Sequence, residues 1–302
     1  MFSTDADARR SQLFGRKMDR RTFIGTATAA ALMRRISFSQ PQAEGEHRIE
    51  KIGLELYTVR DLLKKDFEGT LAQVAKIGYR EVEFAGYIND MPHLNPPPKR
   101  AREILDANGL SAPACHVSYG ILSADKWPKA LEISETLGHK YIVNPSIDRA
   151  LGKTSDGWKK AAEKFNWAGK ESERSGIQFG YHNHVEEFEA LPDGKLPYDI
   201  LLSECDPKLV KMEMDLGWAH EAGIDPIKYF AKYPGRFPLV HVKDFDKNRM
   251  ITDVGSGEID WKPIFAKSEL AGIKHYFVEH DQPVMPMETA RKSYEYLEKL
   301  RF

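Results

Sequence analysis

Short apolar runs recur along the chain from residue 49 to its end, and each is followed by an amphipathic stretch with helical spacing. The runs predict strands and the longer stretches predict helices. Successive strands start about 30 residues apart, which is the length of one strand with its helix and loops. The eight predicted strands are 52–58, 81–84, 112–117, 141–144, 177–181, 210–215, 239–243 and 276–279.

Eight strands that alternate with helices form either a closed barrel or an open sheet. An open nucleotide-binding sheet usually has a glycine-rich turn after its first strand, whereas residues 57–61 contain no glycine. The Gly255-Ser256-Gly257 segment is better explained as a turn before a helix. We therefore predict a (β/α)8 TIM barrel over residues 49–302. Its helices are expected to end at left-handed glycines, namely Gly78, Gly109, Gly138, Gly176 and Gly272.

Composition narrows the class of protein further. The chain has 302 residues, of which 41% are hydrophobic, so it can bury the core of one barrel. Its 44 basic and 45 acidic residues nearly cancel, which argues against nucleic acid as a partner. Cys115 and Cys205 fall in different strand–helix units, so no disulfide framework is expected.

Residues 1–48 differ from the rest of the chain. Residues 19–25, Asp-Arg-Arg-Thr-Phe-Ile-Gly, resemble the twin-arginine export motif, and a short apolar stretch follows at 26–33. This stretch is shorter than the roughly 20 residues that span a bilayer, so no stable membrane anchor is expected. The segment predicts export to the periplasm by the twin-arginine route. The alternative is a basic N-terminal tail on a cytoplasmic protein.

Ionisable side chains follow six of the eight predicted strands. In a parallel barrel these positions lie at one face, where barrel enzymes carry their chemistry. A single histidine there is more often a hydrogen-bonded core residue, and Glu83 or Glu213 could pair with Lys243 or Arg60; the whole set favours a site. The ionisable residues are Glu83, His116, His182, His184, Glu213, Asp215, His241, Lys243 and Glu279, and Asn183 lies between His182 and His184.

The period of two along a strand assigns directions to these side chains. Glu213 and Asp215 share one face of their strand, and Met212 and Met214 share the other, so the carboxylates are expected to point inward. The same spacing turns His241 and Lys243 inward. A mixed set of imidazoles and carboxylates suits a divalent metal such as Mn, Co, Mg, Zn or Fe.

From residue 49 to 302 the sequence resembles the sugar phosphate isomerase/epimerase family, whose members have the xylose isomerase-like TIM barrel. The resemblance is carried by five segments together, at 53–61, 181–184, 213–218, 241–244 and 278–281. In the family's epimerases one metal is held by a Glu, an Asp, a His and a Glu. The resemblance implies that Asp215, His241 and Glu279 occupy three of these positions, and that His182 replaces the first Glu.

This replacement bears on the reaction, because the epimerases use two glutamates on opposite faces of the substrate. Glu279 is retained as a candidate base. The candidates for the second acid or base are Lys243, Glu213, His116 and His184. Trp218, which stands where relatives often have His, could form an apolar platform for a sugar ring or could belong to the core. The other candidate substrate-binding residues are Glu83, Asn183 and His184.

Four functions remain open from the sequence. The first is a metal-dependent sugar isomerase or epimerase that removes a proton α to a carbonyl and forms an enediolate. The second is a lyase or hydratase that acts on 3-keto-glycosides by the same first step. A nuclease of the endonuclease IV type is disfavoured, because it needs more metal ligands and a basic surface. A non-catalytic sugar-binding barrel would not require Glu279, Glu213 and Lys243 together.

Overall fold

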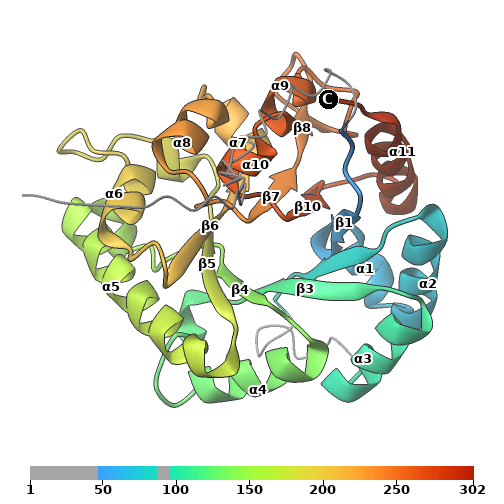
Figure 1. Ribbon diagram of the computed structural model, residues 1–302, viewed down its shortest axis with the longest axis horizontal. Helices are drawn as coiled ribbons and strands as arrows, with labels where there is room; N and C mark the ends of the chain where they lie inside the picture. Colours follow the sequence, from blue (N-terminus) through green and yellow to red (C-terminus); the bar gives the residue numbers. More distant parts are fainter. Residues whose placement is uncertain (1–46, 87–95) are drawn as a thin grey trace, which may run out of the picture. The chain divides into compact units, whose positions relative to one another are not determined.

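The computed structural model describes residues 47–86 and 96–302. The predicted export segment therefore lies outside the described residues. Eight parallel strands close into a barrel in the order β1-β10-β7-β6-β5-β4-β3-β2, which confirms the barrel and excludes the open sheet (Figure 1). The strands are β1 (Ile52–Glu55), β2 (Glu81–Phe84), β3 (Ser111–His116), β4 (Tyr141–Asn144), β5 (Gln178–His182), β6 (Val210–Asp215), β7 (Leu239–Val242) and β10 (His275–Val278).

Helices surround the barrel and cover the outer faces of its strands (Figure 1). Each of the five glycines expected to end a helix has a positive φ, between 63° and 134°, which confirms that prediction. The helices are α1 (Arg60–Leu63), α2 (Phe67–Ile77), α3 (Pro98–Ala107), α4 (Trp127–Leu137), α5 (Ser155–Ser172), α6 (Pro197–Glu204), α7 (Leu216–Glu221), α8 (Pro226–Lys232), α9 (Trp261–Phe265), α10 (Ser268–Ala271) and α11 (Pro286–Lys299).

Two local elements differ from the prediction. The first strand does not continue to residue 58 but ends at Glu55, where the chain enters the 3-10 helix η1 (Leu56–Val59). Glu55 caps this helix by accepting a hydrogen bond from the Tyr57 amide at 3.2 Å. After β7 the chain also forms a small antiparallel hairpin of β8 (Asp244–Phe245) and β9 (Ile251–Thr252), which the sequence pattern did not reveal.

The apolar core has two layers. Met212, Met214, Val240 and Val242 belong to the outer layer, between strands and helices, as the period of two predicted. A smaller cluster fills the inside of the barrel, and its members are Ala114, Tyr141, Val143, Leu239 and Phe277. This inner cluster lies below the polar residues at the C-terminal ends of the strands and forms the floor of the barrel mouth.

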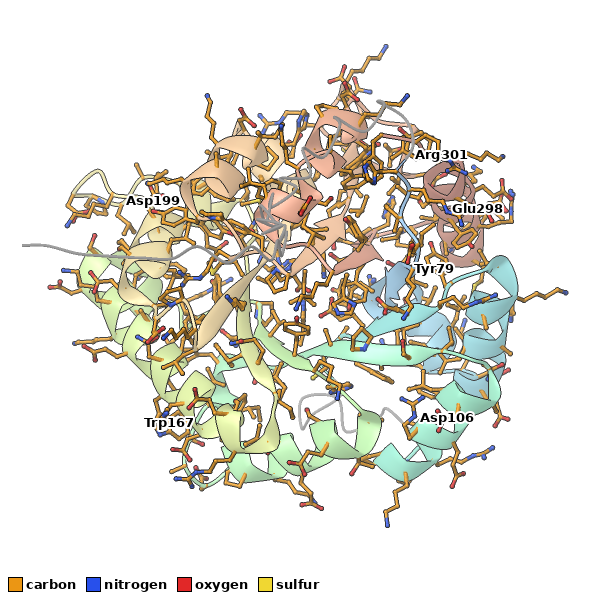
Figure 2. The ribbon with its side chains drawn as sticks, viewed as in Figure 1. Tyr79, Asp106, Trp167, Asp199, Glu298 and Arg301 are labelled. Carbon is orange, nitrogen blue, oxygen red and sulfur yellow. The ribbon has the colours of Figure 1, made fainter. Side chains whose placement is uncertain are left out.

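A buried hydrogen bond joins the outer helices to the barrel. Tyr79, which precedes β2, is fully buried and donates a hydrogen bond from its hydroxyl to the Ala290 carbonyl of α11 at 2.8 Å (Figure 2). Asp106 and Glu298 instead extend outward from α3 and α11 (Figure 2). Cys115 and Cys205 are both free and buried, so the two residues form no disulfide with each other.

Within residues 47–86 and 96–302, no helix is both long enough and apolar enough to cross a membrane.

Candidate active site at the barrel mouth

Ionisable side chains from seven of the eight barrel strands, or from the residues just after them, converge at the C-terminal end of the barrel. All but His116 are buried, and the His116 side chain is only 12% exposed. Charged groups buried this densely must pair with one another or bind a ligand, because their transfer from water is costly. The set comprises Glu55, Glu83, His116, His182, Glu213, Asp215, His241, Lys243 and Glu279.

The structure brings together the four residues predicted as metal ligands. Ligand atoms of His182, Asp215, His241 and Glu279 all lie within 4.8 Å of one another. Asp215 Oδ2 is 3.9 Å from both His182 Nε2 and His241 Nδ1, and Glu279 Oε2 is 2.8 Å from His241 Nδ1. Two imidazoles and two carboxylates at this spacing fit one divalent metal ion of borderline softness.

The other nitrogen of each metal-facing histidine lies close to a deeper carboxylate. His182 Nδ1 is 3.2 Å from Glu213 Oε2, and His241 Nε2 is 2.7 Å from Glu83 Oε2. A carboxyl oxygen that accepts the N–H of one imidazole nitrogen leaves the opposite nitrogen as an electron-pair donor and holds the ring in place. Glu83 and Glu213 thus support the arrangement in which His182 Nε2 and His241 Nδ1 face the candidate metal position.

Lys243 follows β7 and points into the same cluster. Its Nζ lies 2.9 Å from Asp215 Oδ2, 2.8 Å from Glu279 Oε2 and 3.1 Å from Asp281 Oδ1. The ammonium also lies 4.9 Å from the centroid of the Trp218 ring. A buried lysine that contacts three carboxylates remains charged, because the attraction outweighs the cost of desolvation.

The electrostatics separate the ionisable groups into two kinds. Burial raises the pKa of the Glu279 carboxyl, but Lys243 and His241 together hold it well below its usual value. Burial lowers the pKa of His241, but Glu213 and Glu279 raise it well above the usual value. For His182 burial dominates, with the charge of His241 adding to it, and its pKa falls well below the usual value. Glu279 is therefore a carboxylate and His182 a neutral imidazole at neutral pH.

Glu55 and Glu83 lie next to each other on paired strands and have the opposite tendency to Glu279. Burial, reinforced by the charge of Glu213, raises the pKa of Glu83 to about 8. Burial, together with the charge of Glu83, raises the pKa of Glu55 well above its usual value. These two side chains therefore carry protons at neutral pH, next to groups that are charged.

A cavity of about 390 Å³ opens above this cluster, which is large enough for a small sugar. Among the described residues that line it, none is lysine or arginine. Its lining is instead made of hydroxyl, imidazole, carboxyl and small apolar groups. The lining residues are Glu55, Tyr57, Ala85, Gly86, His116, Val117, Ser118, Pro145, Ser146, His182, His184, Glu279 and Asp281.

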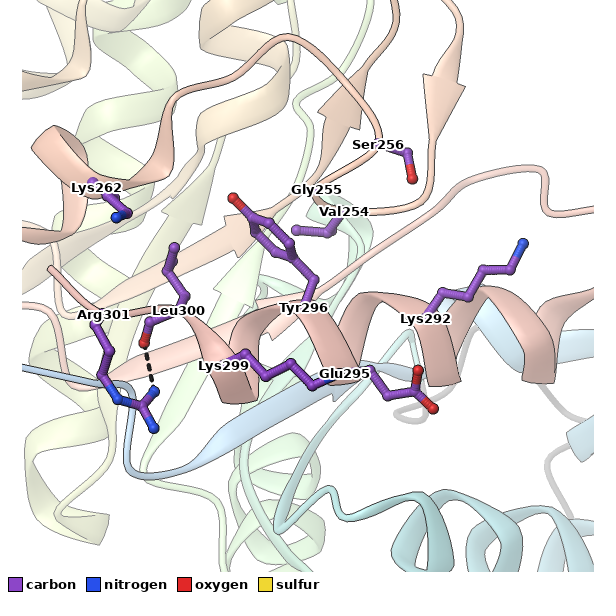
Figure 3. Close-up of a pocket in the computed structure, with 10 residues that line it drawn as sticks. All are labelled: Val254, Gly255, Ser256, Lys262, Lys292, Glu295, Tyr296, Lys299, Leu300 and Arg301. Atoms are coloured by element: carbon purple, nitrogen blue, oxygen red, sulfur yellow. Dashed lines mark hydrogen bonds between the residues drawn. The ribbon is translucent and has the colours of Figure 1, made fainter.

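A larger hollow of about 750 Å³ lies elsewhere, between α11 and the loop that precedes α9 (Figure 3). Tyr296 extends from α11 toward Val254 and Gly255, and a side chain on Gly255 would collide with its ring, because a Cβ atom there would lie 2.2 Å from it. The side chains around it include four cations: Lys262, Lys292, Lys299 and Arg301. The converging acids and imidazoles make the barrel mouth the better candidate for catalysis.

The predicted substrate-binding residues occupy different depths. His184 lines the cavity. Asn183 is fully buried, and its Oδ1 accepts a hydrogen bond from the Asp215 backbone amide at 3.2 Å, which fixes the backbone that carries this carboxylate. Trp218 packs against Phe245, with ring centroids 5.2 Å apart. Asn183, Trp218 and Glu83 are not among the residues that line the cavity.

Two carboxyl groups of the cavity, those of Glu55 and Asp281, were not among the sequence candidates. Glu55 seemed to lie in the middle of the first strand, because Leu54-Glu55-Leu56-Tyr57 continues an alternating pattern. Asp281 follows β10 by three residues and belongs to the Glu279-His280-Asp281 motif, where only Glu279 was selected. The second carboxylate of that motif is the sequence feature that could have identified Asp281 as a cavity residue.

The barrel matches known proteins in sequence and in structure. The inosose dehydratase of Lacticaseibacillus casei is 28% identical over 274 residues, which cover 77% of this chain and 89% of that protein. A sugar phosphate isomerase/epimerase from Parabacteroides distasonis ATCC 8503 is 30% identical, with a TM-score of 0.72, and the match covers 86% of this chain and 96% of that one. The IolI protein, solved with zinc, shares the fold at 16% identity and a TM-score of 0.64, over 81% of this chain and 95% of that one.

The family described as the xylose isomerase-like TIM barrel matches residues 71–300, which is more than half of the chain. The protein belongs to this family and is an enzyme of the isomerase or lyase type.

Proposed function

We propose that the protein is a metal-dependent lyase that eliminates water, or another group β to a carbonyl, from an uncharged keto sugar or keto cyclitol. The observation that supports this choice is His182, whose Nδ1 lies 3.2 Å from Glu213 Oε2. By the family resemblance, this histidine stands where the epimerases have a glutamate. Epimerisation by two bases needs a carboxylate on each face of the substrate, whereas elimination needs one base and one acid. The inosose dehydratases among the relatives support the same choice.

Glu279 is the base in this proposal. Its Oε2 faces His241 and Lys243, each at 2.8 Å, which leaves Oε1 for the proton on the carbon α to the substrate carbonyl. The low pKa of Glu279 keeps it ionised at neutral pH, so the carboxylate carries no proton that would have to leave first. A divalent metal held by His182, Asp215, His241 and Glu279 would act as a Lewis acid on the carbonyl, which makes the adjacent C–H bond more acidic.

His116 is the acid that completes the elimination. It lines the cavity, and its Nε2 lies 2.7 Å from Glu213 Oε2, so Nδ1 is the nitrogen left for the substrate. When the C–H bond breaks toward Glu279, the C–O bond at the β carbon breaks as well. His116 gives its proton to the departing oxygen, which leaves as water, and the product is an α,β-unsaturated ketone.

The lining of the cavity supports a substrate without phosphate. Phosphate sites usually contain arginine, lysine or clustered backbone N–H groups. Here the groups at the cavity surface include His184, Glu55 and Asp281, which suit hydroxyl groups. Lys243 lies behind this surface, and its ammonium forms ion pairs with the carboxylates of Asp215, Glu279 and Asp281.

The test uses the full chain, stripped of metal and reloaded with Mn²⁺, Co²⁺ or Zn²⁺, in heavy water with a panel of keto cyclitols, 3-keto-glycosides and free ketoses. We expect a metal-dependent rise in the absorbance of the unsaturated ketone. Glu279→Gln should lower kcat by at least about a hundredfold, because it removes the base. The matched control is Glu189→Gln on the exposed surface, which should leave the rate unchanged.

A different pattern would favour the isomerase. The isomerase/epimerase from Parabacteroides distasonis is the observation that keeps this second candidate open. If deuterium enters a recovered ketose whose stereochemistry or carbonyl position has changed, and no unsaturated product forms, the lyase proposal is wrong. If no substrate loses water or exchanges a proton with any metal, both reactions are excluded for the panel.

A further inference from the structure

The candidate metal site already contains a cation of the protein itself. Lys243 Nζ lies 2.9 Å from Asp215 Oδ2 and 2.8 Å from Glu279 Oε2, and these two residues supply both carboxylates of the metal set. The lysine is only 1% exposed and lies among protein atoms on every side. Its ammonium and a metal ion would therefore need the same carboxylates.

A third carboxylate lies next to the ammonium but outside the metal set. Asp281 Oδ1 is 3.1 Å from Lys243 Nζ, and Asp281 lines the cavity, where its side chain is 23% exposed. The Trp218 ring lies on the ammonium as well, at 4.9 Å from its centroid. An ammonium that leaves Asp215 and Glu279 for Asp281 stays out of solvent, and its position relative to the Trp218 ring changes.

We propose that Lys243 is an internal competitor of the metal: its ammonium holds Asp215 and Glu279 together in the metal-free protein, and metal binding shifts it toward Asp281. This inference rests on the metal site of the proposed function. Lys243 thereby sets the affinity of the site, because two cations that share two carboxylates repel each other.

The test measures metal affinity directly, without turnover. The stripped full-length protein is titrated with Zn²⁺ or Mn²⁺ in competition with a chromophoric chelator. Lys243→Met, which keeps the length of the side chain and removes its charge, should bind the metal at least about tenfold more tightly than the wild type. Asp281→Asn should bind it more weakly, since the displaced ammonium loses its alternative partner.

The double variant Lys243→Met/Asp281→Asn separates this mechanism from general electrostatics. If Asp281 acts through Lys243, the effect of Asp281→Asn should nearly vanish when the lysine is absent. If Asp281→Asn weakens binding equally in both backgrounds, the carboxylate acts on the metal by itself and the proposed shift is wrong. Circular dichroism checks that each variant is folded.

A second measurement needs no variant of the lysine. Departure of the ammonium should change the fluorescence of Trp218 when metal is added to the wild type, and Trp218→Phe should remove that change. If metal binds and the emission of Trp218 stays constant, the proposal is overturned. This readout decides the question if Lys243→Met fails to fold.

The results also distinguish this inference from the proposed function. Metal binding by Lys243→Met alone, and not by the wild type, supports the competition and contradicts a metal-dependent reaction. Equal binding by the two proteins, or binding by neither, overturns the competition. Metal-dependent turnover with equal affinities would retain the lyase and remove the role assigned to Lys243.

Discussion

Glu187 shows how a single buried carboxyl positions a residue of the cavity. Its Oε2 accepts a hydrogen bond from the His184 amide at 2.7 Å, and its Oε1 lies 2.7 Å from the Tyr181 hydroxyl. Burial raises the pKa of Glu187 from 4.5 to about 7 in spite of these contacts. Glu187 is therefore more easily protonated in the folded protein than in the unfolded chain. Because it binds the His184 amide, its protonation state affects the loop that carries His184.

This preference makes the stability depend on pH. The unfolded chain ionises at Glu187 near pH 4.5, whereas the folded protein resists ionisation until about pH 7. The contribution of Glu187 is complete below pH 4.5 and is lost as the pH rises through 7. The loss corresponds to about 3 kcal/mol. In urea unfolding, we expect Glu187→Gln to gain stability relative to the wild type between pH 4.5 and 7.5.

The difference between the two proteins is the quantity to compare, because other groups titrate in both. An amide at position 187 can still accept from the His184 amide and donate to the Tyr181 oxygen, so its hydrogen bonds are retained. If the two free energies of unfolding run parallel over this pH range, Glu187 is already ionised in the folded protein at low pH. The assigned direction of its pKa would then be wrong.

Residue types at strand ends were readable from the sequence, but their partners were not. The period of two correctly turned Glu213, Asp215, His241 and Lys243 into the barrel. Nothing in the sequence indicated that Glu213 would lie 2.7 Å from His116, which is 97 positions away in the chain. Such contacts depend on the stagger of all eight strands, and this stagger is a property of barrel closure.

At the scale of elements, β1 shows why one position of a barrel strand must be a glycine, which has no side chain. Gly53 pairs with Phe277 of β10, and a Cβ atom at position 53 would lie 2.5 Å from the Phe277 ring. Phe277 fills the inner cluster below the polar residues. The close approach of β1 thus allows a large ring inside the barrel and fixes the floor of the site.

Gly53→Ala should therefore destabilise the fold by about 1–3 kcal/mol, because the new methyl group displaces Phe277. The control is Gly120→Ala, where the nearest atom is 3.9 Å from an added Cβ. Its effect should stay within about 0.5 kcal/mol. Thermal unfolding of both variants checks the comparison, and equal losses would mean that Phe277 can move without cost.

The end of β1 was the least predictable element. An alternating pattern from residue 52 to 58 fits a strand, and only the hydrogen bond from the Tyr57 amide to Glu55 shows that the chain turns there. Short 3-10 helices leave a weak signal in a sequence, since they have no periodic apolar face. Because of this turn, Glu55 is the last residue of β1 and lies at the cavity.

At the scale of the whole barrel, the sequence predicted the fold class and the eight strands, because each strand–helix unit repeats the same pattern. It also predicted at which end of the barrel the ionisable side chains gather. The cavity and the contacts of Lys243 required the three-dimensional structure. The three carboxylates around that lysine come from β6 and from the chain after β10, and a sequence does not place these side by side.

The central claim is that His182, Asp215, His241 and Glu279 form one metal centre at the barrel mouth. Its most direct test is anomalous X-ray diffraction from crystals equilibrated with Zn²⁺, recorded on both sides of the zinc absorption edge. We expect one strong peak about 2.0–2.2 Å from a ligand atom of each of the four residues. A peak bound by other side chains, or no peak at saturating zinc, would contradict the claim.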